Sequence, residues 1–337
     1  MNATTVGIDL AKNMFHVHGA DEKGHRVFTQ RVSRSRLREF IANLPSCLIG
    51  MEACGGAHYW ARCFQAMGHT VRLISPQFVK PFVKSNKNDR NDAEAICEAV
   101  CRPTMRFVAI KSIEQQDRQA LHRVRQRLIG QRTALINQIR GLLSEYGIVI
   151  ARQPAALRRR LPEVLEDGDN ELSPSARCLF SQLHDELIEI QHRLNPVDQA
   201  IKDLAAQDET CRRLQDVEGV GPLTATALTA AVGDARVFEN GRQFAAFLGL
   251  VPRQYSSGGK ERLGGISKRG DTYLRTLLIH GARAAVRSAR KKDTARANWI
   301  RRLEQRCGLQ KTIVAVANKN ARVLWALMAR GEVYKAA

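Results

Sequence analysis

Two stretches decide the fold of the N-terminal third of this chain: Thr5-Val-Gly-Ile-Asp-Leu10 and Cys47-Leu-Ile-Gly-Met-Glu52. Each is a short run of apolar, β-favouring residues that leads to a carboxylate, Asp9 in the first run and Glu52 in the second. Such runs predict buried strands, at 4–10 and 47–52, so each carboxylate is expected to emerge at the end of its strand. The surrounding sequence predicts further strands at 14–20, 26–32 and 69–74, and helices near 35–43, 57–67, 76–83 and 89–101.

The order of these elements indicates a fold. Three meandering strands, a helix and a fourth strand are the order of an RNase H-like domain, which belongs to the α/β class. In that topology the first and fourth strands lie side by side. Asp9 and Glu52 would then be neighbours at one edge of the sheet, although they are far apart in the sequence.

A second acidic pair, Asp89 and Asp92, lies in Asn88-Asp-Arg-Asn-Asp-Ala93 at the start of a predicted helix. Residues three apart lie on one face of a helix. Four carboxylates gathered in one place repel one another unless hard cations lie between them. Mg²⁺ prefers oxygen ligands, and paired Mg²⁺ ions activate a nucleophile and stabilise the leaving oxygen in phosphodiester chemistry. The sequence therefore predicts a site for Mg²⁺ or Mn²⁺ at Asp9, Glu52, Asp89 and Asp92.

Each acid also has a simpler explanation. Asp89 and Asp92 would be a helix N-cap and an acid that the helix dipole favours. Asp9 would open the turn after its strand, and Glu52 would begin a loop. These explanations treat the residues singly and do not account for all four in strand, strand and helix contexts, so the joint metal site is the preferred interpretation.

The charge of the chain indicates a nucleic acid as partner. Its 337 residues include 53 Lys and Arg against 33 Asp and Glu, which gives a formal net charge of +20 and a pI of about 10.1. The stretch from Arg253 to Arg330 has 19 basic and 4 acidic residues, a net charge of +15. A surface that is merely soluble mixes both signs, so this end is predicted to contact a phosphate backbone.

The cysteines and the apolar runs indicate a cytoplasmic protein with no membrane partner. Eight cysteines occur without C-x-x-C spacing, and most lie in apolar segments, which predicts reduced, buried thiols. They are Cys47, Cys54, Cys63, Cys97, Cys101, Cys178, Cys211 and Cys307. The chain opens with no signal segment, and no apolar run approaches the length of a membrane span.

The middle of the chain predicts two long helices. Leucines recur every seven residues from Leu121 to Leu142, after Ser112-Ile-Glu-Gln115, which fits a capping box. A second apolar stripe runs from Leu183 to Leu204. Joined by a Pro-, Arg- and acid-rich loop at 151–172, the stripes predict an antiparallel hairpin with coiled-coil packing and subunit contacts; ordinary amphipathic helices packed on a domain are the alternative. Pro196 is expected to kink or split the second helix.

The last part of the chain combines a glycine turn with a serine loop. Gly219-Val-Gly221 lies between two short predicted helices, a pattern typical of a helix-hairpin-helix whose backbone N–H groups, Gly219 and Gly221 included, contact a DNA phosphate. Ser256 and Ser257 follow in a Ser-Ser-Gly-Gly turn. The basic residues that bracket this turn are Arg253, Lys260, Arg262, Lys268 and Arg269, and an Ala- and Arg-rich helical tail comes after them. A serine hydroxyl among cations and phosphates is a candidate covalent nucleophile, although such turns are more often flexible loops.

These residues together resemble the DEDD transposases of bacterial insertion sequences, the "one-ten" family, and most closely its "eleven-eleven" subgroup. The resemblance covers nearly the whole chain. It rests on Gly7-Ile-Asp-Leu-Ala-Lys12, Gly50-Met-Glu52, Asn88-Asp-Arg-Asn-Asp-Ala93, Gly219-Val-Gly-Pro222, Gly249-Leu-Val-Pro252, Ser257-Gly258 and Ile266-Ser-Lys-Arg-Gly270.

The resemblance implies three domains and a chemistry. The domains are a RuvC-like domain at 1–110, a coiled-coil hairpin at 111–207 and a mostly helical transposase domain at 208–337. The acidic tetrad would bind Mg²⁺, and Ser257, the serine before Gly258, would attack a DNA phosphate and form a covalent phosphoserine link. Lys268 and Arg269 are expected to hold the phosphate. Family members are site-specific recombinases that act on donor and target DNA. Cutting and rejoining several strands requires several subunits, so a dimer or tetramer that meets at the helical hairpin is expected. Some members are directed by a structured RNA from the element's noncoding end, so a guide RNA is a further candidate partner.

Two other functions are alternatives. A metal-dependent, Holliday-junction-type endonuclease would cleave with water, form no covalent adduct and use the serine loop only to contact DNA. A non-enzymatic nucleic-acid scaffold would not need the intact acidic tetrad. Spacing alone does not choose between Ser256 and Ser257.

Overall fold

The computed structural model describes residues 2–84 and 88–335, and its contacts divide the chain into two compact units, Met1–Glu114 and Gln115–Ala337. Among these residues the first unit is α/β, and the second is helical apart from one two-stranded hairpin. The class predicted for each part is therefore confirmed. No helix in the described part of the chain is long and apolar enough to cross a membrane.

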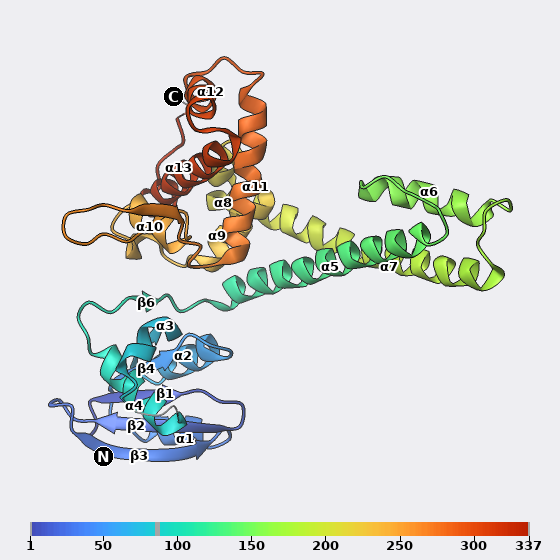
Figure 1. Ribbon diagram of the computed structural model, residues 1–337. Coiled ribbons are helices and arrows are strands. Elements are labelled where there is room, and N and C mark those ends of the chain that lie inside the picture. The colour runs from blue at the N-terminus through green and yellow to red at the C-terminus, as the bar shows by residue number, and fades with distance from the viewer. Residues whose placement is uncertain (1, 85–87, 336–337) are drawn as a thin grey trace. The chain divides into compact units, whose positions relative to one another are not determined.

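A six-stranded sheet forms the centre of the N-terminal unit, with the order β3-β2-β1-β4-β5-β6 (Figure 1). The strands are β1 (Thr5–Asp9), β2 (Met14–Ala20), β3 (Arg26–Ser33), β4 (Leu48–Glu52), β5 (Thr70–Ile74) and β6 (Phe107–Val108). The first five strands were predicted and β6 was not. β1 runs antiparallel to β2 and parallel to β4, which confirms that the first and fourth strands lie side by side.

One face of this sheet packs against α2 (Ala57–Ala66), which contributes aromatic side chains to the core. The helices of the unit are α1 (Leu37–Ala42), α2 (Ala57–Ala66), α3 (Pro76–Val79), a 3₁₀ turn at Lys80–Phe82 and α4 (Asp89–Val100). Ile8 and Met51, which are paired between β1 and β4, are fully buried in one core with Trp60 and Phe64 of α2. Because alternate strand residues point to opposite faces, the residues before them in β1 and β4 face the other way.

Two glycines allow α4 to lie directly on that other face. Gly7 and Gly50 are paired across β1 and β4. A Cβ atom on Gly7 would lie 2.2 Å from the carbonyl oxygen of Ala93, and one on Gly50 would lie 2.8 Å from the Cβ of Val100. The glycines therefore set the height of α4 above the sheet, and with it the position of the first residue of α4, Asp89.

A helical hairpin forms the first part of the C-terminal unit. It consists of α5 (Ile113–Ser144) and α7 (Pro174–Gln207), which are joined through α6 (Pro154–Glu166) (Figure 1). Arg125 lies 2.5 Å from Asp198, and Arg132 lies 3.0 Å from Gln191. Seven residues forward on α5 thus correspond to seven residues back on α7, so the predicted antiparallel arrangement is confirmed.

The apolar stripe of α5 belongs largely to the chain's own core. Leu128 is 1% exposed and Leu135 5%, whereas Leu121 is half-buried and Leu142 is 37% exposed. An α-helix turns once every 3.6 residues, so a seven-residue stripe drifts away from the seam. Towards its end α5 buries Ile139 instead.

The segment 151–172 is not the plain loop that was predicted, because α6 occupies most of it. Leu157, Leu161 and Val164 follow the helical spacing and are buried in one cluster with residues of α5 and α7. The high content of Pro, Arg and acids concealed this periodicity. Pro154 lies in the first turn of α6, where its missing N–H costs nothing.

Pro196 does not split α7, which runs without a break from Pro174 to Gln207. A proline inside a helix leaves the carbonyl four residues earlier without its partner. Here that residue is His192, and both His192 and Pro196 are exposed. Water can therefore replace the missing hydrogen bond.

The rest of the C-terminal unit is a helical cluster around one core. Its helices are α8 (Glu209–Gln215), α9 (Pro222–Ala231), a 3₁₀ turn at Ala235–Val237, α10 (Gly241–Phe247), α11 (Thr272–Ala289), α12 (Ala295–Cys307) and α13 (Leu309–Arg330). Phe244, Leu278 and Val316 lie in this core. The helices that flank Gly219-Val-Gly221 and the helical tail were predicted. The strands β7 (Pro252–Gln254) and β8 (Leu263–Ile266) were not.

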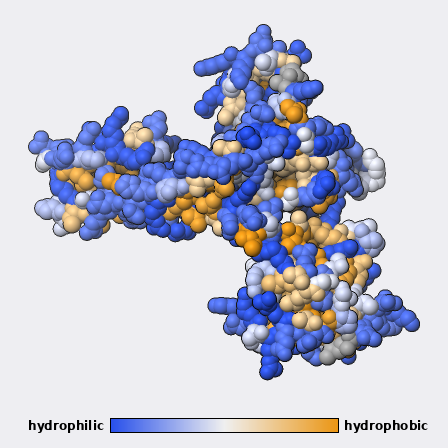
Figure 2. All heavy atoms as spheres, turned by 180° about the vertical axis from the view of Figure 1, so that it is seen from behind, coloured by the Kyte–Doolittle hydropathy of each residue, from blue (hydrophilic) through white to orange (hydrophobic). Residues whose placement is uncertain are grey.

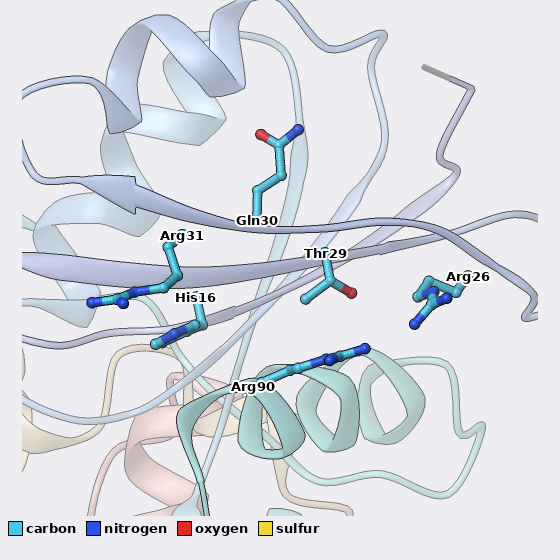
Figure 3. Close-up of a pocket in the computed structure, with 6 residues that line it drawn as sticks. All are labelled: His16, Arg26, Thr29, Gln30, Arg31 and Arg90. Carbon is cyan, nitrogen blue, oxygen red and sulfur yellow. The ribbon is translucent and has the colours of Figure 1, made fainter.

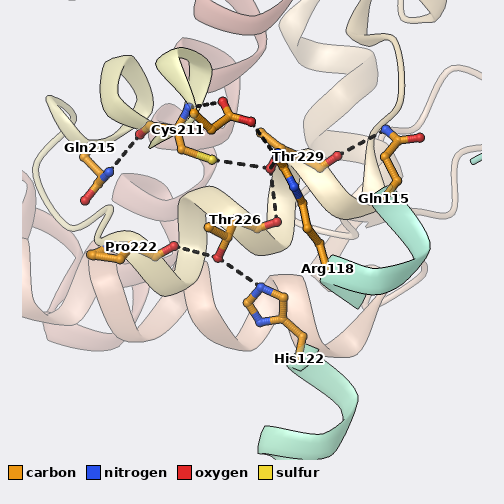
Figure 4. A network of polar contacts seen from close by, with 9 residues as sticks. Gln115, Arg118, His122, Cys211, Gln215, Pro222, Thr226 and Thr229 are labelled. Atoms are coloured by element: carbon orange, nitrogen blue, oxygen red, sulfur yellow. Dashed lines mark hydrogen bonds and ion pairs between the residues drawn. The ribbon is translucent and has the colours of Figure 1, made fainter. Parts of the chain in front are cut away.

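A buried polar network joins α5 to α9 (Figure 4), and His122 of α5 also contacts Tyr273 of α11. His122 is 4% exposed, its Nδ1 lies 3.0 Å from the Tyr273 hydroxyl, and its Nε2 lies 3.0 Å from Oγ1 of Thr226. Burial lowers the pKa of His122 to about 4. Arg118 donates to Asp208 at 2.6 Å beside it. The hairpin is therefore fixed to the C-terminal helices by specific polar contacts.

The cysteines are less buried than predicted. Cys47, Cys97 and Cys211 are buried, Cys63 and Cys307 are half-buried, and Cys54, Cys101 and Cys178 are exposed; all eight are free thiols. An apolar segment of an amphipathic helix still has a solvent face, so its sequence does not fix the exposure of a cysteine within it.

Candidate active site

Asp9 and Glu52 lie at the same end of two paired strands. Asp9 is the last residue of β1 and Glu52 the last of β4. The two strands are parallel, and the residues just before these acids, Ile8 and Met51, are register partners. Partial desolvation raises the pKa of Cys54, and the negative charges of Glu52 and Asp9 raise it further. Both carboxylates therefore act on one neighbouring thiol.

Asp89 reaches the site from α4 and is not the cap of that helix. The N-cap is Asn88, whose side chain accepts the backbone N–H of Asn91 at 2.9 Å. The simpler explanation of Asp89 as an N-cap is therefore wrong. Asp89 and Asp92 both lie in the first turn of α4, where Asp89 is exposed and Asp92 is half-buried.

Three side chains from β1, β2 and α4 converge. Asp9, His16 and Asp89 each offer a ligand atom, and these atoms all lie within 4.8 Å of one another. His16 is the register partner of Asp9 on β2. Among the residues that the structure describes, no group of this kind includes Glu52 or Asp92. Half of the predicted tetrad is thus gathered together with a histidine that was not predicted.

The His16 imidazole is directed at Asp89 without a hydrogen bond to it. Its Nδ1 lies 3.5 Å from Oδ2 of Asp89, in a side chain that is 14% exposed. This nitrogen is buried and has no hydrogen-bond partner among the described residues. The distance is that of an ion pair only if the imidazole is protonated, and the contact is too long for a strong hydrogen bond. A buried imidazole nitrogen without a hydrogen-bond partner can offer its lone pair to a metal ion, which would then be the missing partner.

The sequence contained one signal for His16. The hairpin of β1 and β2 turns at 10–13, so a residue two places into β2 must oppose the end of β1. A histidine in that place, within the otherwise apolar run Met14–Val17, was open to this interpretation.

The serine loop is a β-hairpin whose two serines differ in their surroundings. It projects from the helices beside α10 (Figure 1). Ser256 Oγ accepts from Nε2 of Gln254 at 3.0 Å and from the backbone N–H of Arg262 at 3.4 Å. Ser257 is exposed, and among the described residues none is hydrogen-bonded to its hydroxyl. Ser256 thus holds the hairpin together, and Ser257 presents a hydroxyl at its tip.

Gly258 has a conformational role that the sequence did not reveal. Its φ is 54°, and the φ of Gly259 is 76°. Two successive residues with positive φ form the tight turn between hairpin strands, and glycine adopts this conformation without strain. No atom lies within 4 Å of a Cβ built on Gly258, so the space around the tip is open.

The neck of this hairpin is closed by glycines in close contact. Gly249 has φ 72° and Gly270 has φ 87°. A Cβ on Gly249 would lie 2.0 Å from the carbonyl oxygen of Arg269, and one on Gly270 would lie 1.9 Å from that of Phe247. Between them Lys268 has φ 54°, which is uncommon for a residue with a side chain. The neck is therefore a specific backbone structure.

Arg275 of α11 donates hydrogen bonds to backbone carbonyl groups of the neck. Its side chain is 8% exposed, and its Nη1 donates to the carbonyl oxygens of Leu248 and Arg269, each at 3.3 Å. Its Nη2 donates to Oγ1 of Thr272 at 3.1 Å. No pattern in the sequence pointed to this residue, because one arginine among many carries no signal of burial.

The predicted nucleic-acid residues of the hairpin are all at the surface. Arg253, Lys260, Arg262, Lys268 and Arg269 are exposed. Arg253 lies in β7, Lys260 and Arg262 lie between the two strands, and Lys268 and Arg269 follow β8, so they flank Ser257 in the sequence on both sides. Their charges are therefore available to a phosphate backbone.

The two glycines predicted to contact DNA differ. Gly219 has φ 86°, and a Cβ there would lie 2.4 Å from the carbonyl oxygen of Gly281 in α11. The backbone N–H of Val220 already donates to the carbonyl of Val217 at 2.9 Å. Gly221 is exposed and is the N-cap of α9. Packing against α11 thus explains Gly219, whereas Gly221 faces solvent.

Comparison with known proteins agrees with this arrangement. A family model for DEDD transposases of the IS110 type, described as "Transposase", matches residues 6–148, which include the four acidic positions. A second, described as "Transposase IS116/IS110/IS902 family", matches residues 211–298, which include the serine hairpin.

Three relatives are similar to this chain over nearly their whole length. The chain is 52% identical to the "Probable family 20 transposase" of Pseudomonas aeruginosa over 99% of both chains. It is 48% identical to the "Transposase for insertion sequence element IS1111A" of Coxiella burnetii, over 98% of this chain and 91% of the relative. It is 43% identical to the "Transposase for insertion sequence element IS1328" of Yersinia enterocolitica, over 99% of both. The chain therefore belongs to the IS110 family of insertion-sequence transposases.

Proposed function

We propose that this transposase cuts and rejoins DNA strands through a divalent-metal site at Asp9, Glu52, Asp89 and Asp92 and a covalent phosphoserine at Ser257. One observation carries the proposal: Asp9 and Asp89, from distant parts of the sequence, have ligand atoms within 4.8 Å at the end of β1. The N-terminal unit is proposed to be RuvC-like, a form of the RNase H fold, and the sheet order with β1 between β2 and β4 supports this.

The residues present fit a divalent cation. Carboxylate oxygens are the ligands that Mg²⁺ and Mn²⁺ prefer, and the buried, unpartnered Nδ1 of His16 adds a nitrogen donor that Mn²⁺ accepts more readily than Mg²⁺ does. Asp9 and Asp89 would hold the ion, with Glu52 and Asp92 as further ligands from β4 and α4. When bound, it would activate the attacking hydroxyl and offset the negative charge on the phosphate oxygens.

The proposed covalent step uses Ser257 as nucleophile. Its hydroxyl loses a proton as Oγ bonds to phosphorus, and the strand oxygen that leaves takes up a proton. The serine ester keeps the energy of the broken phosphodiester bond, so a second strand end can reverse the step without ATP. The open space around Gly258 and the exposed hydroxyl of Ser257 support this assignment over Ser256, whose hydroxyl is engaged in the hairpin.

DNA is the proposed substrate, and its phosphates are proposed to contact the hairpin cations. Lys268 and Arg269 at the neck would hold the phosphate that Ser257 attacks. Gly221 would offer its backbone to a second phosphate if α8, the glycine turn and α9 act as a helix-hairpin-helix. The net charge of +15 between Arg253 and Arg330 supports binding through phosphates, and the affinity for DNA should then fall steeply as the salt concentration rises.

Several chains are proposed to act together, since several strands must be cut and rejoined. Figure 2 shows apolar side chains along the arm that α5, α6 and α7 form. Exposed apolar residues of this arm include Val124, Leu142, Leu179 and Ile188. We propose that the subunits of a dimer or tetramer contact one another through these helices, and the mass of the full chain measured by light scattering tests this. Leu128 and Leu135 are unsuitable test positions, because they are buried in the chain's own core.

A single assay tests the central proposal. The full chain is incubated with Mg²⁺ and DNA carrying an element end, with and without RNA transcribed from the element's noncoding end, and protein–DNA adducts are separated on a denaturing gel. We expect adducts from the unaltered chain and from Ser256→Ala, and none from Ser257→Ala or Asp9→Asn. A requirement for the RNA would make it a second partner.

Two outcomes would overturn the proposal. Adducts formed by Ser257→Ala would remove Ser257 as the nucleophile. Cleaved DNA with free ends and no adduct from any variant would instead establish a water-using, metal-dependent endonuclease.

A further inference from the structure

A hollow of about 450 Å³ lies on the N-terminal unit beside the Asp9, His16 and Asp89 group (Figure 3). It is lined by His16, Arg26, Thr29, Gln30, Arg31 and Arg90. The sequence did not point to this place, because the predicted nucleic-acid residues all lay between positions 219 and 269. Its lining contains three arginines and no carboxylate.

The topology explains why these residues meet. His16 on β2 is the register partner of Arg31 on β3, and His18 is the partner of Thr29. Residues two apart in a strand point to the same face, so Thr29 and Arg31 share one face of β3. Arg90, in the first turn of α4, extends across that face in Figure 3.

No carboxylate of the described residues lines the hollow beside its three arginines. Among the described residues, no guanidinium group of Arg26, Arg31 or Arg90 forms an ion pair or donates a hydrogen bond. Behind the lining residue Thr29 lies His18, which is 6% exposed and whose Nδ1 is 3.0 Å from Oγ1 of Thr29.

Exposed arginines usually form a solvated face, and their position here argues against that explanation. Like charges that gather around one hollow repel one another, and the structure supplies no carboxylate among the lining residues to relieve the repulsion. An anion would relieve it. The arginine fork also matches the oxygens of a phosphate in a bidentate manner.

The hollow is continuous with the proposed metal site through shared and adjacent residues. His16 belongs to both, and Arg90 follows Asp89 directly in the sequence. A strand whose phosphate lies at Asp9 and Asp89 would therefore have its next phosphates beside Arg31 and Arg90.

We propose that this arginine hollow binds the backbone phosphates of the DNA strand that is cut, next to the phosphate at the metal site. The proposal rests on the proposed function for the location of the cut strand. A guide RNA presents the same phosphodiester groups, but the continuity with the metal residues favours the strand that reacts there.

The test measures binding without cutting. All variants are made in the full chain carrying Asp9→Asn, so adduct formation plays no part, and affinity for element-end DNA is measured across a salt series. The test variant is Arg31→Gln with Arg90→Gln. The matched control is Arg38→Gln with Arg106→Gln, which removes two exposed arginines of the same unit outside the hollow.

Each phosphate contact contributes about 0.9 to the slope of log affinity against log salt on duplex DNA. We expect the test variant to lose about 1.8 from that slope and the control to lose none. Equal slopes for test and control would overturn the proposal, and so would a loss seen with the element RNA alone. A smaller slope for the test variant with DNA would support the arginine hollow as a phosphate site even if no Ser257 adduct is ever detected. Failure of the serine chemistry is therefore distinguishable from failure of this surface.

Discussion

Replacing Gly7 by alanine tests whether the close approach of α4 to β1 is what assembles the acidic site. The new Cβ would lie 2.2 Å from the carbonyl oxygen of Ala93 and 2.5 Å from the backbone nitrogen of Cys97. Ordinary contact begins at 3.4 Å, so α4 must rise by about 1.2 Å, because both neighbours are backbone atoms that no side-chain rotation can move. Asp89, the first residue of α4, would move with it away from Asp9.

The displacement predicts a modest loss of stability and a large loss of activity. Forcing a methyl group into a packed core costs about 1–3 kcal/mol, which leaves most folded domains intact. A misplacement of about 1 Å at reacting groups can cost about a hundredfold in rate. We therefore expect Gly7→Ala to remain folded in urea titrations and to form the DNA adduct roughly a hundred times more slowly in single-turnover measurements with Mg²⁺.

The control makes the same substitution where the structure leaves room. Gly130 is exposed on α5, and a Cβ there would meet no atom within 4 Å. Alanine in a helix interior is more favourable than glycine by about 0.5–1 kcal/mol, so Gly130→Ala should unfold at a higher urea concentration and form the DNA adduct at the normal rate. Normal adduct formation by Gly7→Ala would refute the reasoning, since α4 would then not set the position of Asp89.

Three further predictions concern single side chains. His122 has a pKa of about 4 in the folded chain, below its ordinary 6.5. As the pH falls from 6.5 to 4, the unfolded chain therefore binds a proton at this residue that the folded chain does not, and the free energy of unfolding should drop by up to about 3 kcal/mol. The variant His122→Gln should lack this part of the drop. In the Mn²⁺-loaded chain, pulsed electron paramagnetic resonance should detect a nitrogen coupling that His16→Ala abolishes; no coupling in the unaltered chain would exclude His16 as a ligand. Arg275→Lys, which lacks the planar fork that holds the hairpin neck, should slow adduct formation at unchanged DNA affinity. A variant that reacts normally would show that the neck holds without the fork.

The parts of the fold that sequence could predict are those in which residue pattern and structure coincide locally. The runs before Asp9 and Glu52 are apolar and β-favouring, and these strands formed as expected with their acids at the ends. The pairing of β1 with β4 followed from the order of elements. Heptad spacing likewise predicted α5 and α7 and their antiparallel arrangement.

The remaining features depend on contacts between segments that no local pattern records. His16 approaches Asp89 only because β2 folds back on β1 while Gly7 admits α4 above them. Arg275 is buried only because Gly249 and Gly270 bring their neighbours' carbonyls to one place. In each case the sequence shows a common residue type, and the tertiary neighbour gives it a role.

The glycines of Gly219-Val-Gly221 separate what packing requires from what DNA contact would require. Gly219 has φ 86° and touches the backbone of Gly281, so any side chain there would disturb α11 and weaken DNA binding indirectly. Gly221 has φ −102°, caps α9, and has open space where a Cβ would lie. Serine is at least as favourable as glycine at an N-cap, so Gly221→Ser should leave the free energy of unfolding unchanged within about 0.5 kcal/mol. If a DNA phosphate approaches this turn, the added side chain obstructs it, and affinity should fall in the folded variant. Unchanged affinity would remove the turn from the DNA interface, since its exposed glycine would then tolerate atoms in the space that the phosphate needs.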